Sequence, residues 1–267
     1  MAHMTSPAAE ALLDTPVPVL DHGFVRLVDY LGTDSRIVQS ARVSYGEGTK
    51  TVRQDKGLIA YLLRNEHMSP FEQVVFTFHV KMPIFVARQW VRHRTARMNE
   101  ISGRYSVLPS EFYLPEAADL CYQRTDNRQG RDEQRDVPPE LTHKVLDYLK
   151  NDAETCYGHY QEMLSDDLSR EIARINLPLA LYTEMYWQID LRNLLHFIRL
   201  RMDNHAQKEI RVYAEVLAKA VEAVTPYAWE AFEEHVLHAK KLSRSQAQKL
   251  SLFLATANPA LKDELEL

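Results

Sequence analysis

The pattern of apolar and polar residues along the first quarter of the chain predicts one strand and two helices. A run rich in valine, leucine and tyrosine from Gly23 to Leu31 predicts the strand. The sequence Gly-Thr-Asp at 32–34 then provides a turn and a cap for a helix over 35–45, and an apolar stripe predicts a second helix over 51–65. The segment 5–20 holds three prolines and small side chains, so we expect it to be poorly ordered.

Strict alternation begins after Pro70 and predicts a strand with one strongly apolar face, formed by Val74, Phe76, Phe78 and Val80. Pro83 ends this strand and suits the first turn of a helix over 83–93.

That helix would place Gln89, Arg92 and His93 on one face, because residues three and four apart are neighbours on a helix. If the chain then extends, Glu100, Ser102 and Arg104 lie on one face of a strand, because the side-chain period there is two.

The second half of the chain is predominantly helical by the same criterion. Helices are predicted over 140–166, 169–176, 191–202, 207–224 and most of the last forty residues, with extended segments over 104–113 and 179–188. The most polar stretch, 119–139, predicts a long flexible loop. We therefore expect one α+β domain, with a mixed sheet and long helices, over 21–240. A flexible segment (1–20) precedes it and a helical extension (241–267) follows it.

Composition narrows the class of protein. The 267 residues are 45% hydrophobic and 26% charged, as in ordinary globular proteins, and no apolar stretch is long enough to span a bilayer. A formal net charge of -5 argues against a nucleic-acid-binding surface, which needs a basic face. The two cysteines, Cys121 and Cys156, form no metal spacing and no disulfide framework, so we expect a cytoplasmic protein.

Basic residues are concentrated in two clusters instead of being spread over the chain. The first, 89–106, combines arginines with one histidine, one glutamate and several hydroxyl groups, which predicts a cationic pocket wall for an anionic ligand with polar ring edges. The second, 190–209, places Arg192, His196 and Arg199 opposite an apolar helix stripe. Periodicity by itself favours a solvated face for these three residues.

Other chemistries are poorly supported by the sequence. Two neighbouring arginines push His93 towards its neutral form, and arginines also repel a metal cation, so we expect no metal site. Neither cysteine lies in a dense polar stretch, and Ser102 has no glycine elbow, so nucleophilic catalysis is not indicated. No glycine-rich phosphate loop is present, so any nucleotide binds outside the usual glycine-rich folds.

Four blocks in the same order carry a family resemblance. Arg92-His93-Arg94, followed after seven residues by Ser102, matches the R-H-R-x7-S signature of the flavin-dependent thymidylate synthases. The blocks SPFEQVVFTFHVKMPIFVARQW, REIARINLPLALYTEMYW and RMDNHAQKEI also resemble that family, so the resemblance runs from about Gly23 to about Phe232.

The resemblance implies a homotetramer with active sites shared between subunits. It also implies conversion of dUMP to dTMP with bound FAD, NADPH as reductant and 5,10-methylenetetrahydrofolate as one-carbon donor, without a cysteine nucleophile. Arg201 would be the catalytic residue, favouring ionisation at N3 of the uracil.

The ligand contacts implied by the resemblance are the following. For dUMP they are Gln89, Trp90, Val91, Arg92, Glu100, Ile101, Ser102, Gly103, Arg104, Arg174 and Arg201. For FAD they are Ser69, Arg92, His93, Arg94, Glu100, Asp190, Leu191, Arg192 and His196.

Three positions depart from what many relatives carry. Arg97 replaces a small hydroxyl residue and adds positive charge, while Asp190 and His196 stand where amides are frequent. The alternative hypothesis is a non-catalytic nucleotide- or RNA-binding module that uses the basic stretch. The net acidity and the lack of a basic sheet studded with aromatic residues count against that alternative.

Overall fold

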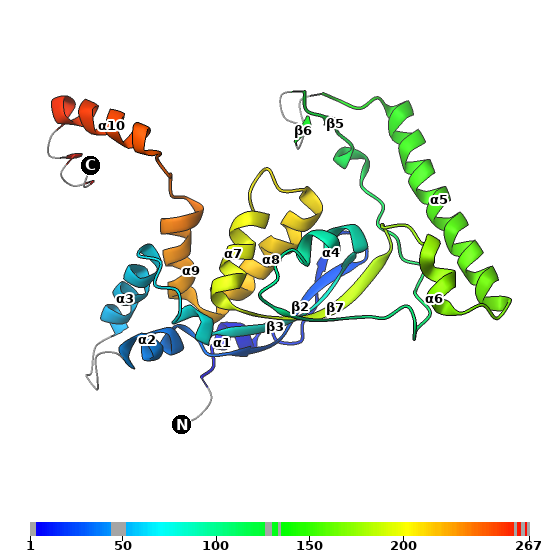
Figure 1. Ribbon diagram of the computed structural model, residues 1–267, viewed down its shortest axis with the longest axis horizontal. Helices are drawn as coiled ribbons and strands as arrows, with labels where there is room; N and C mark the ends of the chain where they lie inside the picture. The colour runs from blue at the N-terminus through cyan, green and yellow to red at the C-terminus, as the bar shows by residue number, and fades with distance from the viewer. Residues whose placement is uncertain are drawn as a thin grey trace.

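The computed structural model describes residues 4–43, 52–125, 130–132, 135–258, 261–262 and 265. Its centre is a five-stranded sheet with the order β1-β2-β3-β7-β4 (Figure 1). The strands are β1 (Val17–Val19), β2 (Gly23–Leu31), β3 (Val75–Pro83), β7 (Tyr182–Asp190) and β4 (Arg97–Glu100). All four strand pairs of this sheet are antiparallel.

Ten α-helices in the described part of the chain accompany the strands. They are α1 (Pro7–Glu10), α2 (Asp34–Arg42), α3 (Val52–Arg64), α4 (Ile84–Trp90), α5 (Pro139–Ser165), α6 (Arg170–Ala173), α7 (Leu191–Arg201), α8 (Lys208–Val224), α9 (Pro226–Phe232) and α10 (Arg244–Ala257). A π-helical turn spans Glu233–Leu237. No helix in the described part of the chain is long and apolar enough to cross a membrane.

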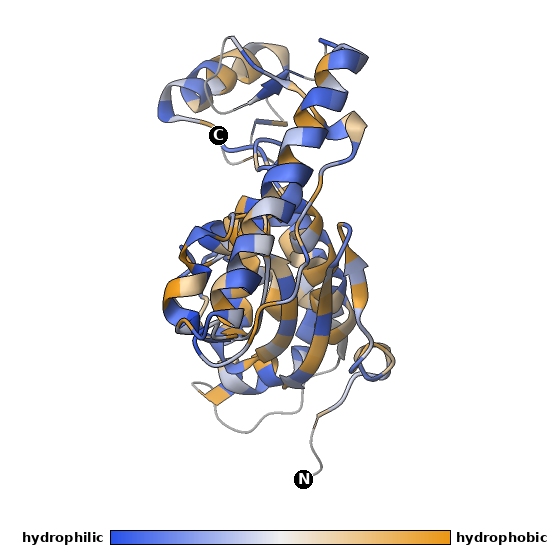
Figure 2. Cartoon of the chain, turned by 90° about the vertical axis from the view of Figure 1, so that its right-hand side faces the viewer, coloured by the Kyte–Doolittle hydropathy of each residue, from blue (hydrophilic) through white to orange (hydrophobic). Residues whose placement is uncertain are grey.

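One face of the sheet is apolar and is covered by α4, α7 and α8 (Figure 1). The alternation in β3 puts Phe76, Phe78 and Val80 on this face, all fully buried. Figure 2 shows hydrophobic colours along the strands, while the long helix α5, which faces the viewer, is mostly hydrophilic. Only Ala153 and Tyr160 are buried on α5, so this helix lies at the periphery.

An aromatic cluster fixes the end of α4 against α7. The ring of Trp90 lies 5.0 Å from that of Trp187 on β7 and 4.7 Å from that of Phe197 on α7. All three side chains are fully buried. Because Trp90 is the last residue of α4, the segment that follows must run alongside α7, and this placement brings the two basic clusters together.

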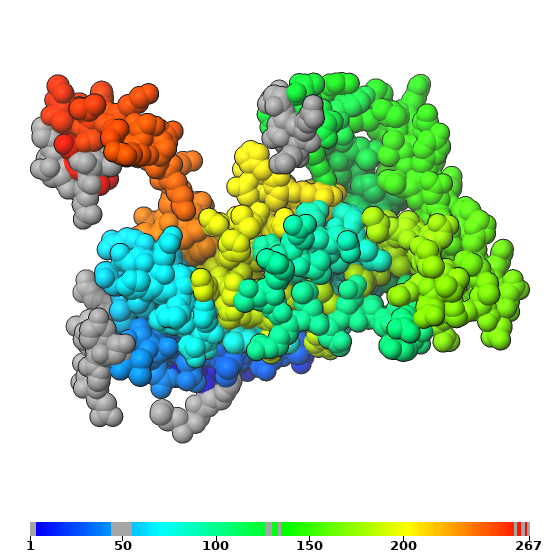
Figure 3. Space-filling model, in the orientation of Figure 1, coloured from blue at the N-terminus to red at the C-terminus, as the bar shows by residue number. Residues whose placement is uncertain are grey.

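A buried carboxylate joins α2 to α9. Asp34 is 8% exposed, and its two carboxylate oxygens accept hydrogen bonds from the backbone N–H groups of Tyr227 and Ala228, at 2.9 and 3.0 Å. Beyond α9 the chain leaves the body, and α10 forms an arm that projects from it (Figure 3).

The α+β class is confirmed, but the sheet is antiparallel where we expected mixed strand directions. The links are long enough for crossovers, but the one through α2 and α3 returns the chain in the opposite direction, so β3 pairs with β2 antiparallel. The predicted helices over 140–166, 191–202 and 207–224 are confirmed as α5, α7 and α8 within two residues. The ends of the helices predicted over 35–45 and 51–65 that fall on 44, 45 and 51 lie outside the described residues.

Three other expectations about secondary structure were wrong. The segment 5–20 contains α1 and β1, because Ala9 is buried and β1 pairs with β2. The stretch 104–113 is not a strand and makes only an isolated bridge between Phe112 and Leu181. Within the described part of 119–139, the expected loop contains a hairpin of β5 (Tyr122–Gln123) and β6 (Arg131–Asp132).

Candidate functional site

The chain turns immediately after α4, which ends at Trp90, so the predicted helix over 83–93 is three residues too long. The N–H of His93 donates to the carbonyl of Trp90 at 3.0 Å in a tight turn. Gln89 therefore lies on the helix, whereas Arg92 and His93 lie in the turn that follows it. Packing of Trp90 in the aromatic cluster, and not helical periodicity, aims these side chains.

The second cluster begins where β7 passes into α7. Asp190 caps the helix by accepting from the N–H and side-chain amide of Asn193, at 3.0 and 2.7 Å. Arg192 forms an ion pair with Glu72 and does not line the site. Asn193, His196 and Leu200 form the face of α7 that lines the site, so the predicted face of Arg192, His196 and Arg199 is offset from it.

A cavity of about 350 Å³ lies between the turn and α7. Its lining comes from both basic clusters and comprises Arg92, His93, Arg94, Thr95, Ile189, Asn193, His196, Leu200 and Arg201. The prediction missed four of these, namely Thr95, Ile189, Asn193 and Leu200. Spacing of three and four residues from His196 was the available signal for two of them, but their neutral side chains did not mark them as part of a charged site.

Arg201 is held from two sides. Its Nε donates to Nε2 of His93 at 3.1 Å, and its Nη2 donates to the carbonyl oxygen of Gln89 at 3.0 Å. The side-chain amide of Gln89 in turn donates to Oε1 of Gln207 at 2.6 Å. His93 and the main-chain carbonyl of Gln89 thus fix one guanidinium group at the cavity wall, and Gln207 holds the Gln89 side chain beside it.

The electrostatics of the site explain why His93 is an acceptor here. Burial, then the positive charge of Arg201 and the neighbouring His196, lower the pKa of His93 to about 4. A neutral imidazole whose Nε2 accepts from Arg201 carries its proton on Nδ1. The expectation of a neutral His93 is confirmed, but the cause is burial and Arg201, not the flanking arginines. Burial, followed by the charge of Arg92, also lowers the pKa of Arg201.

Positive charge at the cavity is not balanced by acidic side chains. Arg92 and Arg94 are exposed and form no ion pair within the described residues. Their guanidinium groups are free to bind phosphate bidentately, the neutral imidazoles can donate or accept, and Ile189 offers an apolar wall. This set of groups fits a dinucleotide with a flat ring system and a diphosphate, such as FAD.

The remaining residues predicted to bind dUMP form a second group around α6. Glu100 accepts from the hydroxyl of Thr183 at 2.6 Å, and Nε of Arg104 donates to Glu171 at 3.1 Å. A Cβ atom on Gly103 would stand 3.1 Å from Cδ of Arg174. The absence of a side chain at Gly103 therefore leaves room for the close approach of Arg174.

This second group also differs from the predicted strand geometry. Strand β4 ends at Glu100, and Ser102 and Arg104 lie in a turn in which Ser102 Oγ accepts from the N–H of Arg104 at 3.3 Å. The expected common face of Glu100, Ser102 and Arg104 is therefore wrong.

Other predicted contacts are constrained by their positions. Trp90 and Leu191 are fully buried, so only their backbone atoms could meet a ligand, whereas Ile101 is 41% exposed. Val91 is half-buried and Ser69 is exposed. Arg97, whose role the sequence left open, donates across the sheet to Oε1 of Gln188 at 3.0 Å.

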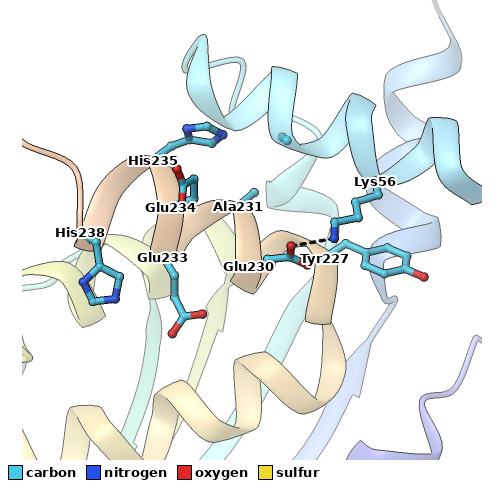
Figure 4. Close-up of a pocket in the computed structure, with 9 residues that line it drawn as sticks. Lys56, Tyr227, Glu230, Ala231, Glu233, Glu234, His235 and His238 are labelled. Carbon is cyan, nitrogen blue, oxygen red and sulfur yellow. Dashed lines mark hydrogen bonds and ion pairs between the residues drawn. The ribbon is translucent and has the colours of Figure 1, made fainter.

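A second cavity, of about 440 Å³, is lined by none of these residues and lies between α3, α9 and the π-helical turn (Figure 4). Three glutamates and two histidines line it, and Lys56 crosses its edge to bind Glu230 at 2.6 Å. Among the described residues, no group of three or more histidine, cysteine, aspartate or glutamate side chains is arranged to hold a metal ion.

Comparison with known proteins decides the family. The family model described as "Thymidylate synthase complementing protein" matches residues 26–227, more than half of the chain. A flavin-dependent thymidylate synthase of Treponema denticola is 58% identical over 255 residues, which cover 95% of this chain and 96% of the relative.

The chain belongs to the flavin-dependent thymidylate synthase family.

Further relatives of this family member agree. A flavin-dependent thymidylate synthase of Rickettsia conorii is 54% identical over 253 residues, covering 90% of this chain and 86% of the relative. The solved structure of a UMP/dUMP methylase, PolB, from Streptomyces cacaoi, bound with 5-Br dUMP, superposes with a TM-score of 0.75 at 32% identity. The match covers 83% of this chain and 99% of PolB.

Proposed function

We propose that this member of the family converts dUMP to dTMP through bound FAD, with 5,10-methylenetetrahydrofolate as the one-carbon donor and NADPH as the reductant. The observation that carries the proposal is the half-buried Arg201, oriented by neutral His93 and by the carbonyl of Gln89 at a cavity with unbalanced positive charge. Such a fixed cation is what a reaction that develops negative charge on a pyrimidine ring requires.

Arg201 stabilises that charge without rearranging. Two of its five N–H groups are used by His93 and Gln89, which leaves three for a ligand in the cavity. Partial burial strengthens their interaction with an anion, because less water screens it. We assign Arg201 the role of favouring ionisation at N3 of the uracil, with His93 as the neutral acceptor that holds it in place.

The cavity residues hold the flavin. Arg92 and Arg94 meet the phosphate groups, while His93, His196 and Asn193 offer polar contacts to the ring system or ribose. When bound, FAD supplies the redox chemistry that lets the one-carbon unit arrive at C5 of uracil as a methyl group. Cys121 and Cys156 are free and neither lines the cavity, in agreement with a reaction that uses no cysteine nucleophile.

The deoxyuridylate phosphate is assigned to the group around α6, with Arg174, Arg104 and the backbone at Gly103 as donors. These residues do not line the Arg201 cavity of the same chain. A site shared between subunits would join the two groups, as expected for a homotetramer. Apolar side chains near this group are exposed, including Ile175 at 73% and Tyr105 at 77%, which is typical of a surface that another copy covers.

A mixing experiment tests the shared site. Arg174→Ala and Arg201→Ala proteins, each expected to be nearly inactive, are unfolded together, refolded and assayed for dTMP formation. Mixed oligomers should regain part of the wild-type activity, because some sites then receive an intact Arg174 from one chain and an intact Arg201 from another. A mixture as inactive as its components would contradict the shared site.

Arg201→Ala tests the catalytic assignment directly. We expect dTMP formation to fall by at least about a hundredfold, the usual effect of removing a preorganised donor to a developing anion, with flavin binding changed much less. Arg211→Ala, an arginine on α8 outside the cavity, is the matched control and should retain activity. Near-normal turnover by Arg201→Ala would refute the role.

The alternative, a non-catalytic nucleotide- or RNA-binding module, predicts a different result for the purified wild-type protein. Such a module would bind uridine nucleotides or RNA without a flavin absorbance band and without NADPH-dependent formation of dTMP. Protein that cannot be loaded with FAD would exclude the proposed synthase activity.

A further inference from the structure

Helix α8 begins after the junction 202–207, which follows Arg201 at the end of α7, and its first turn lacks a side-chain cap. Gln207 is the N-cap residue, but its side chain makes no capping hydrogen bond. The first N–H groups of a helix need partners, and uncapped first turns tend to fray. Residues 203–205 of the junction are exposed, so little packing holds the chain before α8.

Ion pairs from the hairpin segment secure this turn instead. Glu209, in the first turn of α8, is 4% exposed, and both of its carboxylate oxygens accept from Nη2 of Arg131 on β6, at 2.9 and 2.7 Å. The Tyr113 hydroxyl donates to the same carboxylate at 3.2 Å. Beside it, Lys208 forms an ion pair with Asp119. A carboxylate at this end of a helix also interacts favourably with the helix dipole.

The secured turn is bonded to the Arg201 site. The side chain of Gln207 accepts from the side-chain amide of Gln89, and the main-chain carbonyl of Gln89 accepts from Arg201. Fraying of the first turn of α8 would therefore remove the partner that orients the Gln89 amide. Arg201 would keep both of its bonds, because they go to His93 and to the main-chain carbonyl of Gln89 on α4.

We propose that Glu209 is a positioning residue for the Arg201 site: bound to Arg131, it fixes the first turn of α8, so that Gln207 orients the side chain of Gln89 towards the substrate. This gives β6 a function, which is to supply Arg131 as the cation that neutralises Glu209. The proposal deepens the proposed function, since it rests on dUMP being the molecule that Gln89 contacts.

Three variants separate positioning from simple stability. Arg131→Met leaves a buried carboxylate without its cation, so the melting temperature should fall. Glu209→Gln combined with Arg131→Met removes both charges, and replacing both partners of a buried pair restores much of the stability. Arg211→Met removes an arginine of α8 itself, whose pair with Glu215 is 4.0 Å long, and is the matched control.

The expected result is a split between stability and substrate binding. In the double variant the melting temperature returns close to the wild-type value, while the KM for dUMP stays raised by roughly tenfold, a coupling usual within one hydrogen-bond network. The kcat should change by less than about twofold, because His93 still holds Arg201. Arg211→Met should leave KM, kcat and melting temperature unchanged.

Hydrogen exchange of the purified protein gives a readout independent of activity. The amide groups of 207–211 should exchange faster in the double variant than in wild type, and those in the middle of α8 should not. A wild-type enzyme that makes no dTMP would defeat the proposed function, yet this exchange result would still decide whether Glu209 secures the turn. A double variant with wild-type KM and wild-type exchange would overturn the inference.

Discussion

His93 offers the sharpest test of the electrostatics at the site. Its pKa is lowered from 6.5 to about 4, chiefly by burial and then by Arg201. A difference of about 2.5 pKa units corresponds to about 3 kcal/mol between the two protonation states. At pH 7 only about one folded molecule in a thousand would carry the proton, so Arg201 has a neutral acceptor under working conditions.

The sign of the effect on stability follows from linkage. Between pH 6.5 and pH 4 the unfolded chain binds a proton at His93 and the folded chain does not, so stability is lost as the pH falls through this window. The contribution is fully present above pH 6.5. Between pH 7.5 and pH 5 the expected loss from this residue is about 2 kcal/mol, calculated from the two pKa values.

The variant His93→Gln isolates this contribution, because glutamine keeps a side-chain acceptor but does not titrate. The difference in unfolding free energy between wild type and His93→Gln, measured with urea, should change by about 2 kcal/mol from pH 7.5 to pH 5, with the wild type losing stability. All other titrating groups are common to both proteins and cancel. Nitrogen NMR spectra of the histidine rings, with the His93 signal identified by its absence in the variant, should show about a tenth of this ring or less protonated above pH 5. A midpoint near 6.5 would refute the reasoning.

Three further predictions concern other parts of the molecule. Burial raises the pKa of Asp34 to about 6, so stability from this residue is present at low pH and lost as the pH rises from 3.8 to 6; relative to Asp34→Asn, wild type should lose about 2 kcal/mol between pH 4.5 and 7.5 in urea unfolding. Gly103→Ala forces a methyl group against packed side chains, and we expect about 1–3 kcal/mol lower stability and weaker dUMP binding, whereas Gly158→Ala, where nothing lies within 4 Å, should not destabilise. Arg92→Ala should weaken both flavin and dUMP binding, measured as dissociation constants, while Arg88→Ala, outside the cavity, should change neither; unchanged constants for Arg92→Ala would contradict its assignment.

Periodicity and local chemistry determined much of the molecule. The alternation around Phe76 to Val80 specifies β3, and the apolar stripe of α7 specifies which side of that helix is buried, because each pattern suits only one regular structure. The concentration of arginines located both basic clusters, and the four sequence blocks indicated the family. These features are local, so the sequence displays them without knowledge of the rest of the fold.

Only the tertiary structure decided how the two clusters meet. Packing of Trp90 against Trp187 and Phe197 ends α4 early and turns His93 towards Arg201, a residue 108 positions later in the chain. The pKa of His93 depends on that burial, which no neighbouring residue in the sequence specifies. The same holds for Glu209 and Arg131, whose pairing joins a polar stretch that reads as a loop to the first turn of a distant helix. Long-range contacts of this kind arise from how the helices pack on the sheet. Local sequence patterns do not predict which distant residues this packing brings together.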